Sequence, residues 1–284
     1  MLGRNQRNSG LTAEEVSMTI HYTDHRGGFG PGTTNITRDD EEQDNLPITL
    51  DVLKLSAGES LSLTTDRETA WLLMSGTVTG EIGGLPFSFS RESLFDESSS
   101  CIHASAGTEL SLQCSADTEW TVYSCDNTKP FDARVFNPED VANEPRGKGQ
   151  VDDRCLRYVR TIFDDTNSDP NTDLVLGEVV TFQGGWSSYP PHHHAQPEIY
   201  HYRFTEPQGY GHGELGDTVL KVRNNDTVKI LDLNDHAQCA APGYGMYYSW
   251  VIRHLPDDRY SVPEFTEEHR WIMQPDCQYW QPKN

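Results

Sequence analysis

The 284-residue chain is 35% hydrophobic and 10% aromatic, a composition that favours a folded protein with a polar surface and excludes wholesale disorder. Its formal net charge of -22, from 44 acidic and 22 basic residues, argues against a nucleic-acid partner, because binding to phosphates needs a basic surface. No run of about 18 apolar residues occurs, so the sequence predicts no membrane-spanning helix.

The acidic charge has two explanations that the sequence leaves open. An acidic surface with few lysines stays hydrated in a salty cytoplasm, and an ordinary acidic surface keeps a protein in solution. The first twenty residues lack the apolar core of a secretory signal, and none of the six cysteines forms a CxxC pair. We therefore expect a cytoplasmic protein with reduced thiols.

Residues 1–45 are rich in Gly, Asn, Thr, Asp and Glu and include the charged run 38–42, which predicts a poorly ordered N-terminal arm. From residue 46 to 135, short runs follow in which apolar and polar residues alternate. Glycine-containing turns separate these runs, which cover 48–52, 61–63, 70–74, 77–82, 87–89, 110–112 and 120–123. Such spacing predicts a domain of short strands, arranged as a β-sandwich or a barrel.

Residues 126–150 are rich in Asp, Asn, Pro and Gly, and we place a domain boundary there, between residues 135 and 136. A second set of predicted strands follows at 156–163, 174–182, 199–204, 218–222, 227–231 and 246–253. No long amphipathic helix interrupts either half. The sequence thus predicts an all-β protein with two tandem β-barrels or jelly-rolls, at 46–135 and 136–284.

The segment 186–200 reads WSSYPPHHHAQPEIY and contains the strongest chemical signal in the chain. In an extended strand alternate side chains lie on one face, so His192, His194 and Glu198 can all point into one barrel. Two imidazoles and a carboxylate are suitable ligands for Zn²⁺, Mn²⁺, Fe²⁺ or Ni²⁺. His236 is the candidate for a fourth ligand, which a distant strand has to supply.

Aromatic and basic residues near this motif are candidates for contacts with a substrate. Tyr200 and Tyr202 share the parity of Glu198 and can present hydroxyl groups to the cavity, although packing in the core explains them equally well. An anionic substrate also needs a guanidinium or ammonium partner, for which the candidates are Arg203, Lys221 and Arg223. The candidate catalytic residues are therefore Glu198, Tyr200, Tyr202 and Tyr248, and the candidate substrate-binding residues are Arg203, Tyr189 and Tyr244.

The N-terminal half has fewer residues that could bind a metal. It contains only His103 among its predicted strands and no HxH pair, so we expect its barrel to bind no metal and to serve as scaffold, lid or dimer surface. The whole chain also lacks the phosphate-binding P-loop, the GxSxG nucleophile elbow and the HExxH zinc motif.

These motifs resemble those of the 5-deoxy-glucuronate isomerase family, bicupin uronate ketol-isomerases of bacterial and archaeal inositol catabolism. The segment W-S-S-Y-P-P-H-x-H is matched by residues 186–194, and E-x-Y-x-Y/H-R-F by residues 198–204. The element H-x-x-x-A-A-P-G-Y-x-x-Y-Y-x-W-V is matched by residues 236–251, and shorter similarities fall at 137–141, 146–149, 207–210 and 269–271. The resemblance implies a bicupin with one divalent metal ion held by His192, His194, Glu198 and His236.

The resemblance also implies a small anionic sugar substrate, 5-deoxy-glucuronate, and its conversion into 2-deoxy-5-keto-gluconate. Zn²⁺ or Mn²⁺ is the expected ion, with Fe²⁺ and Ni²⁺ as alternatives. Three other functions stay open: another uronate ketol-isomerase, an iron-dependent cupin dioxygenase with the same ligand set, and a non-catalytic sugar-binding cupin. A homo-oligomer stays open as well, because cupins often pair through their sheets.

Overall fold

The computed structural model describes residues 20–41, 46–231 and 233–283. Within these ranges the regular secondary structure is almost entirely β-strand, and the helices are short 3-10 segments, η1 (Pro138–Asp140) and η2 (Glu267–Met273). The prediction of an all-β protein is confirmed. No helix in the described part of the chain is long and apolar enough to span a membrane.

The N-terminal half forms two packed sheets that share one long strand, β5 (Glu68–Ile82). The first part of β5 lies in a sheet with β10 (Arg134–Phe136), β7 (Cys101–Ala104), β9 (Thr118–Cys125), β3 (Thr49–Leu55) and β2 (Gly32–Thr37). The second part pairs with β6 (Leu85–Arg91) and with β8 (Glu109–Cys114), which pairs in turn with β4 (Ser60–Thr64). A register shift between Leu73 and Ser75 marks the passage of β5 from one sheet to the other.

The C-terminal half consists of a seven-stranded and a five-stranded sheet. The seven-stranded sheet has the order β1 (His21–Tyr22), β18 (Thr227–Ile230), β15 (Glu198–Phe204), β20 (Met246–Arg253), β13 (Leu174–Thr181), β12 (Arg157–Phe163) and β11 (Glu144–Arg146). The five-stranded sheet has the order β17 (Thr218–Arg223), β16 (Tyr210–Leu215), β19 (His236–Ala240), β14 (Trp186–His193) and β21 (Glu264–Phe265).

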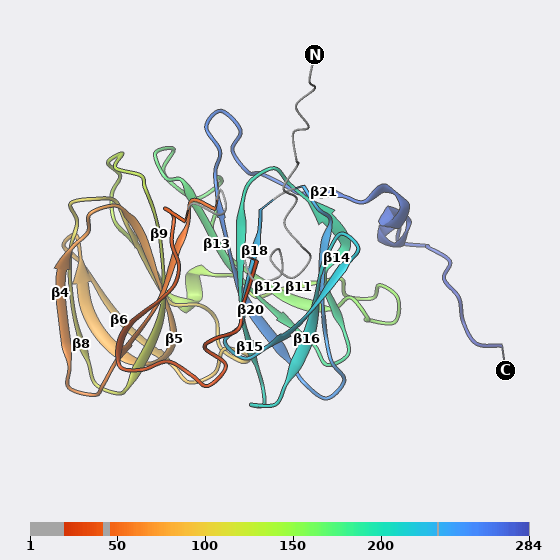
Figure 1. The fold of residues 1–284 in the computed structure, drawn as a ribbon, viewed down its shortest axis with the longest axis horizontal. Helices are drawn as coiled ribbons and strands as arrows, with labels where there is room; N and C mark the ends of the chain where they lie inside the picture. The colour runs from red at the N-terminus through yellow and green to blue at the C-terminus, as the bar shows by residue number, and fades with distance from the viewer. Residues whose placement is uncertain (1–19, 42–45, 232, 284) are drawn as a thin grey trace, which may run out of the picture.

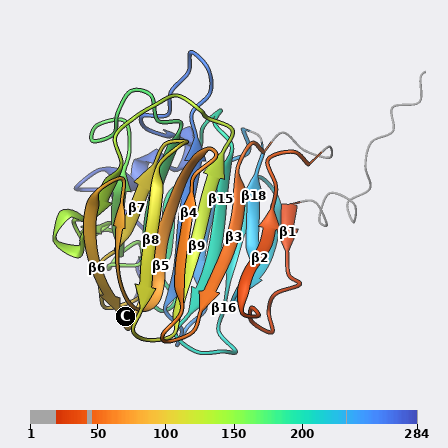
Figure 2. The same ribbon diagram turned by 90° about the vertical axis from the view of Figure 1, so that its left-hand side faces the viewer.

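The sheets stack as successive layers, which run from β4 and β8 at one side to β14 and β16 at the other (Figure 1). The view turned by 90° shows that the strand axes of these layers are roughly aligned (Figure 2). One core cluster joins the halves, because Leu50 and Leu72 of the N-terminal half pack with Leu176 and Val251 of the seven-stranded sheet. The two other clusters lie inside the N-terminal and the C-terminal sandwich.

The alternation of side chains decides which residues of the seven-stranded sheet face the inside of the C-terminal sandwich. On β15, Glu198 and Tyr200 line a pocket there, whereas Ile199 packs in the cluster between the two halves. Arg203 has the parity of Ile199 and forms an ion pair with Glu119 of the N-terminal half. The pleat of one strand therefore separates the site from the contact between the halves.

The structure differs from the expected arm over residues 20–41. Strands β1 and β2 lie there, and β1 pairs with β18 of the C-terminal half. Arg26 also donates two hydrogen bonds, of 2.7 and 2.6 Å, to the Asp226 carboxylate, so pairing with distant segments gives this polar stretch a regular structure. Residues 1–19 and 42–45 of the expected arm lie outside the described residues, and the division between residues 135 and 136 stays a prediction.

Candidate metal centre

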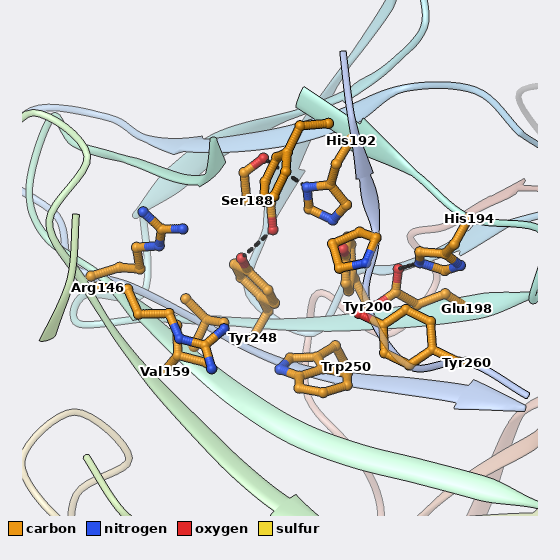
Figure 3. Close-up of a pocket in the computed structure, with 14 residues that line it drawn as sticks. Arg146, Val159, Ser188, His192, His194, Glu198, Tyr200, Tyr248, Trp250 and Tyr260 are labelled. Atoms are coloured by element: carbon orange, nitrogen blue, oxygen red, sulfur yellow. Dashed lines mark hydrogen bonds and ion pairs between the residues drawn. The ribbon is translucent and has the colours of Figure 1, made fainter. Parts of the chain in front are cut away.

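A pocket lies between the two sheets of the C-terminal half, with about 600 Å³ of space outside the protein atoms when its open mouth is included. The side chains that line it include Arg146, Arg157, Ser188, His192, His194, Glu198, Tyr200, Tyr248, Trp250 and Tyr260 (Figure 3). Polar and aromatic side chains thus face one another across this pocket.

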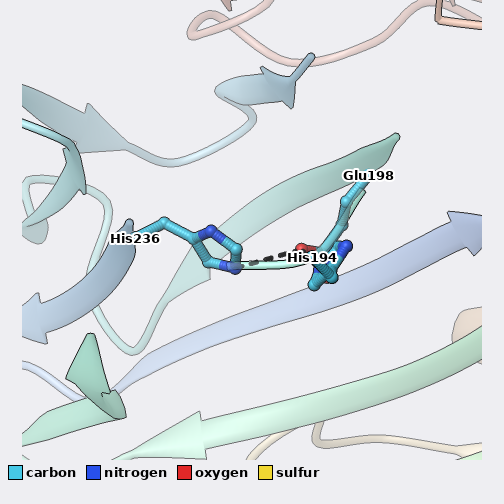
Figure 4. A group of neighbouring side chains, drawn as sticks. All are labelled: His194, Glu198 and His236. Carbon is cyan, nitrogen blue, oxygen red and sulfur yellow. Dashed lines mark hydrogen bonds and ion pairs between the residues drawn. The ribbon is translucent and has the colours of Figure 1, made fainter. Parts of the chain in front are cut away.

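His194, Glu198 and His236, the histidine–glutamate group, bring one ligand atom each to a common point (Figure 4). The Nε2 atoms of His194 and His236 lie 3.2 and 3.4 Å from Glu198 Oε2. All three side chains are buried, and they come from the loop after β14, the start of β15 and the start of β19. The structure thus brings together three of the four predicted metal ligands.

The hydrogen bonds of the two imidazoles leave their Nε2 atoms available to a metal ion. His194 Nδ1 lies 2.9 Å from the carbonyl oxygen of Gln196, and His236 Nδ1 lies 3.2 Å from that of Asn234. Because a carbonyl oxygen only accepts, each Nδ1 carries the hydrogen and each Nε2 presents a lone pair. His236 Nε2 is buried and has no hydrogen-bond partner among the described residues. The Nε2 lone pairs of His194 and His236 and the carboxylate of Glu198 are all electron donors, so a cation between them would suit this arrangement.

Burial shifts the pKa values of His236 and Glu198. It lowers the pKa of His236 well below 6.5, and the nearby rings of His192 and His194 add to the shift. Burial also raises the pKa of Glu198, because it disfavours the charged carboxylate. Both effects arise from the cost of keeping a charge away from water. Neutral imidazoles, which burial favours, are the form that binds metals.

The fourth predicted ligand, His192, lies beside the histidine–glutamate group and is not one of its members. Its ring centroid is 4.4 Å from that of His236, its partner across β14 and β19. Its Nδ1 lies 3.2 Å from the carbonyl oxygen of Ser188, and burial lowers its pKa to about 4. His192 is thus a neutral imidazole at the edge of the group, and its role as a ligand stays a prediction.

The predicted catalytic tyrosines take two different positions. Tyr200 and Tyr248 line the pocket, and the Tyr248 hydroxyl lies 3.0 Å from that of Ser188 and donates a 3.0 Å hydrogen bond to Ser187. Tyr202 lies outside the lining and donates a 2.8 Å hydrogen bond to Gln238. Burial raises the pKa of Tyr248 to about 12, so its phenol is neutral at pH 7 and can donate a hydrogen bond.

The structure places none of the three predicted substrate-binding residues among the side chains that line the pocket. Arg203 faces the N-terminal half, where its Nη2 donates a 2.7 Å hydrogen bond to Glu119. Tyr189 and Tyr244 pack against other aromatic rings. For Arg203 the physical reason is the pleat of β15, which turns alternate residues away from the pocket.

Two arginines and one tyrosine line the pocket without having been singled out as site residues from the sequence. Arg157 has the parity of the pocket residue Val159, so the alternation in the predicted strand 156–163 contained a signal for it. Arg146 belongs to one of the short family similarities, at 146–149. Tyr260, whose ring centroid lies 5.0 Å from that of His194, follows the last predicted strand, where no periodic pattern marks it.

Tandem sandwiches of jelly-roll type, one with histidines and a glutamate converging inside it, define this chain as a bicupin with a candidate metal site. The chain belongs to the KduI/IolB family, whose model matches residues 23–272. An IolB-like protein from Salmonella typhimurium LT2 resembles it with a TM-score of 0.76 and 26% identity, over 90% of this chain and 99% of that one. A variant of Bacillus subtilis oxalate decarboxylase, with a TM-score of 0.59 and 12% identity over 87% of this chain and 79% of its own, shares the fold.

The curated relatives of this chain are named 5-deoxy-glucuronate isomerase. The protein from Geobacillus kaustophilus is 28% identical over 197 residues, which are 61% of this chain and 65% of that protein. The one from Shouchella clausii is 28% identical over 226 residues, or 72% of this chain and 80% of that protein. The matched segment thus spans slightly less than two thirds of the Geobacillus relative.

Proposed function

We propose that this chain is an aldose–ketose isomerase that converts 5-deoxy-glucuronate into 2-deoxy-5-keto-gluconate, a step of inositol catabolism, with one divalent metal ion. The observation that carries the proposal is the convergence of His194, Glu198 and His236 at a pocket lined by polar and aromatic side chains. The names of the relatives supply the substrate. A cytoplasmic location and a homo-oligomer stay predictions from the sequence.

The reaction is redox-neutral overall. One proton moves from C2 to C1, and one moves from the hydroxyl group on C2 to the carbonyl oxygen on C1. A divalent ion held by His194, Glu198 and His236 would supply Lewis acidity to these two oxygens. Nitrogen and carboxylate ligands suit Zn²⁺ and Mn²⁺, which we propose first, as well as Fe²⁺ and Ni²⁺.

The side chains of the pocket have complementary tasks. Tyr248 and Tyr200 have pKa values raised by burial, so both stay protonated and can donate hydrogen bonds to substrate oxygens. Trp250 and Tyr260 form apolar walls of the same pocket. Such walls exclude water, which strengthens the hydrogen bonds that the phenols make at the reacting end of the sugar.

The first test is isomerase activity on 5-deoxy-glucuronate, followed by NMR, with and without a chelator. We expect formation of the ketose to depend on the metal and to be lost in His194→Ala. His193→Ala is the matched control, because His193 points away from the group and binds Asp235 at 2.7 Å. The control should retain both metal content and activity.

The same experiment separates the alternatives. A folded, metal-loaded protein that turns over no 5-deoxy-glucuronate, even at the high salt that an acidic surface can require, would refute this substrate. Turnover of another uronate would then indicate a related isomerase, and oxygen consumption with bound iron would indicate a dioxygenase. Sugar binding without turnover of any uronate would indicate a binding protein.

A further inference from the structure

Two arginines enter the pocket from neighbouring strands. Arg146 ends β11 and Arg157 begins β12; the two residues are cross-strand partners, and both side chains line the pocket. Gly147 lets Arg157 come close, because its φ is +76° and a Cβ atom there would lie 2.8 Å from Arg157 Nη1 and 2.2 Å from the carbonyl oxygen of Cys155. A residue with a side chain would therefore push this arginine away.

Arg157 is a partly buried cation, and no carboxylate among the described residues forms an ion pair with it. Its Nη1 donates a 3.0 Å hydrogen bond to the carbonyl oxygen of Cys155, whereas its Nε is buried and has no partner in the described part of the chain. Arg91 and Arg160, which are fully buried, differ in that both form ion pairs with Glu178. Burial lowers the pKa of Arg157, but a guanidinium stays protonated in proteins.

Arg146 adds a second positive charge at the same end of the pocket. Its side chain is 51% exposed, and its Nε lies 2.9 Å from a carboxylate oxygen of Glu144, which is 50% exposed. An exposed ion pair of this kind contributes little to stability, so a ligand carboxylate can replace Glu144 at small cost. The molecule carries a net charge of -22, and these arginines reverse that sign locally.

The arginines lie at the opposite end of the pocket from the histidine–glutamate group. Figure 3 shows Arg146 at one end and His194 with Glu198 at the other, with Tyr248 between them. The charges of both ends act on Tyr248, since Arg157 lowers its pKa slightly and Glu198 raises it, while burial dominates. A ligand that fills the pocket therefore has one end at the arginines and the other at the histidine–glutamate group.

We propose that Arg146 and Arg157 bind the carboxylate of the substrate and thereby direct the opposite end of the sugar to the histidine–glutamate group. A guanidinium pairs with a carboxylate through two hydrogen bonds, and Arg157 Nε is a buried donor without a partner. In a six-carbon uronate the carboxylate is C6, at the far end from C1 and C2, where the isomerisation takes place. This inference rests on the proposed function, and it assigns to Arg146 and Arg157 the role expected of Arg203.

The test compares Arg157→Met, Arg157→Lys and Arg146→Met with the wild type. Arg154→Met is the matched control, because Arg154 is exposed and does not line the pocket. We expect Arg157→Met to raise KM for 5-deoxy-glucuronate about tenfold or more, since a hydrogen bond to a charged group is lost. Its kcat should change little, because the carboxylate is held equally in the ground state and the transition state. Arg157→Lys should lie between the wild type and Arg157→Met, and metal content should match the wild type throughout.

A binding experiment separates this inference from the proposed reaction. Calorimetry with D-glucuronate and with D-glucose, its neutral counterpart, measures how much the carboxylate adds to affinity. The wild type and Arg154→Met should prefer glucuronate, and Arg157→Met should lose that preference. A general defect in folding would weaken both ligands alike and would leave the preference in place.

The outcomes are distinct. Turnover of 5-deoxy-glucuronate by the wild type, with KM unchanged in Arg157→Met and Arg146→Met, overturns the carboxylate site and leaves the reaction standing. Absence of turnover, with a glucuronate preference that Arg157→Met abolishes, refutes the reaction and supports the carboxylate site. A preference that survives in Arg157→Met and Arg146→Met, or no preference in the wild type, overturns the carboxylate site.

Discussion

Two tyrosines on adjacent strands show how the contacts of a single hydroxyl group determine its role. Tyr248 lines the pocket, where its hydroxyl lies 3.0 Å from that of Ser188 and donates to that of Ser187, whereas Tyr202 lies outside the lining and donates to Gln238. Both rings are buried, and burial raises both pKa values. Acidity therefore does not distinguish the two side chains, but access to a ligand does.

We expect Tyr248→Phe to lower kcat by about tenfold or more, because a preorganised donor at the reacting oxygens is lost. Tyr202→Phe should leave kcat near the wild-type value and lower the free energy of unfolding by about 1–3 kcal/mol, because Gln238 loses its donor inside the core. Steady-state kinetics and urea denaturation of both variants measure these effects. Equal losses of kcat in the two variants would contradict this distinction.

Strand pairing in the seven-stranded sheet decides where the wall of the pocket lies. Gly177 of β13 is the cross-strand partner of Trp250 on β20, and Trp250 lines the pocket. A Cβ atom on Gly177 would lie only 2.3 Å from Cζ2 of the indole. The absence of a side chain on β13 therefore creates the space in which this ring packs.

Gly177→Ala should displace the indole, lower the free energy of unfolding by about 1–3 kcal/mol and raise KM, because the pocket wall moves. Gly30→Ala is the matched control, since a Cβ atom there would meet nothing within 4 Å. Urea denaturation and kinetics of both variants provide the measurement. If Gly177→Ala proves as stable as Gly30→Ala and has the wild-type KM, the indole does not depend on this contact.

In the molecule as a whole, buried polar clusters join the two halves. Arg91 of the N-terminal half binds Glu178 of β13 through hydrogen bonds of 2.7 and 2.9 Å. Glu68 of β5 binds the ring of His103 at 2.9 Å and accepts hydrogen bonds from the backbone of Asp173 and Leu174, in the C-terminal half. The sheet that carries the pocket is therefore tied to the N-terminal half by charge as well as by apolar packing.

Glu68 makes stability depend on pH. Burial acts to raise the pKa of Glu68, but hydrogen bonds from His103, Asn127 and the Asp173 backbone, with the charge of His103, hold it at about 2. Since this lies below the ordinary value of 4.5, the carboxylate stabilises the fold above pH 4.5 and loses that contribution as the pH falls through 2. The shift corresponds to about 3 kcal/mol.

Glu68→Gln should lower the free energy of unfolding at pH 7 and flatten its dependence on pH between about pH 5 and pH 2. Glu81→Gln, at an exposed glutamate on the same strand, should change neither. Urea denaturation at a series of pH values measures both curves. A Glu68→Gln curve that coincides with the wild-type curve would contradict this source of acid sensitivity.

The alternation of apolar and polar residues along the sequence was sufficient to predict the all-β class and to predict that Glu198 and Tyr200 lie on the same face of a strand. Side chains alternate between the two faces of a strand whatever lies beside it. The residue types and spacing of the histidine-rich motif likewise indicated the candidate metal site. By the same alternation, Arg203 and Tyr202 lie on opposite faces of β15. Parity alone therefore predicts that Arg203 points away from the pocket.

The pairing of strands and the stacking of layers needed the folded molecule. They bring His236 to Glu198, and they place Glu119 where it pairs with Arg203. These contacts join segments that lie far apart in the chain. Their free energy comes from burying several strands at once, and no periodicity within one strand records which distant strand will lie beside it.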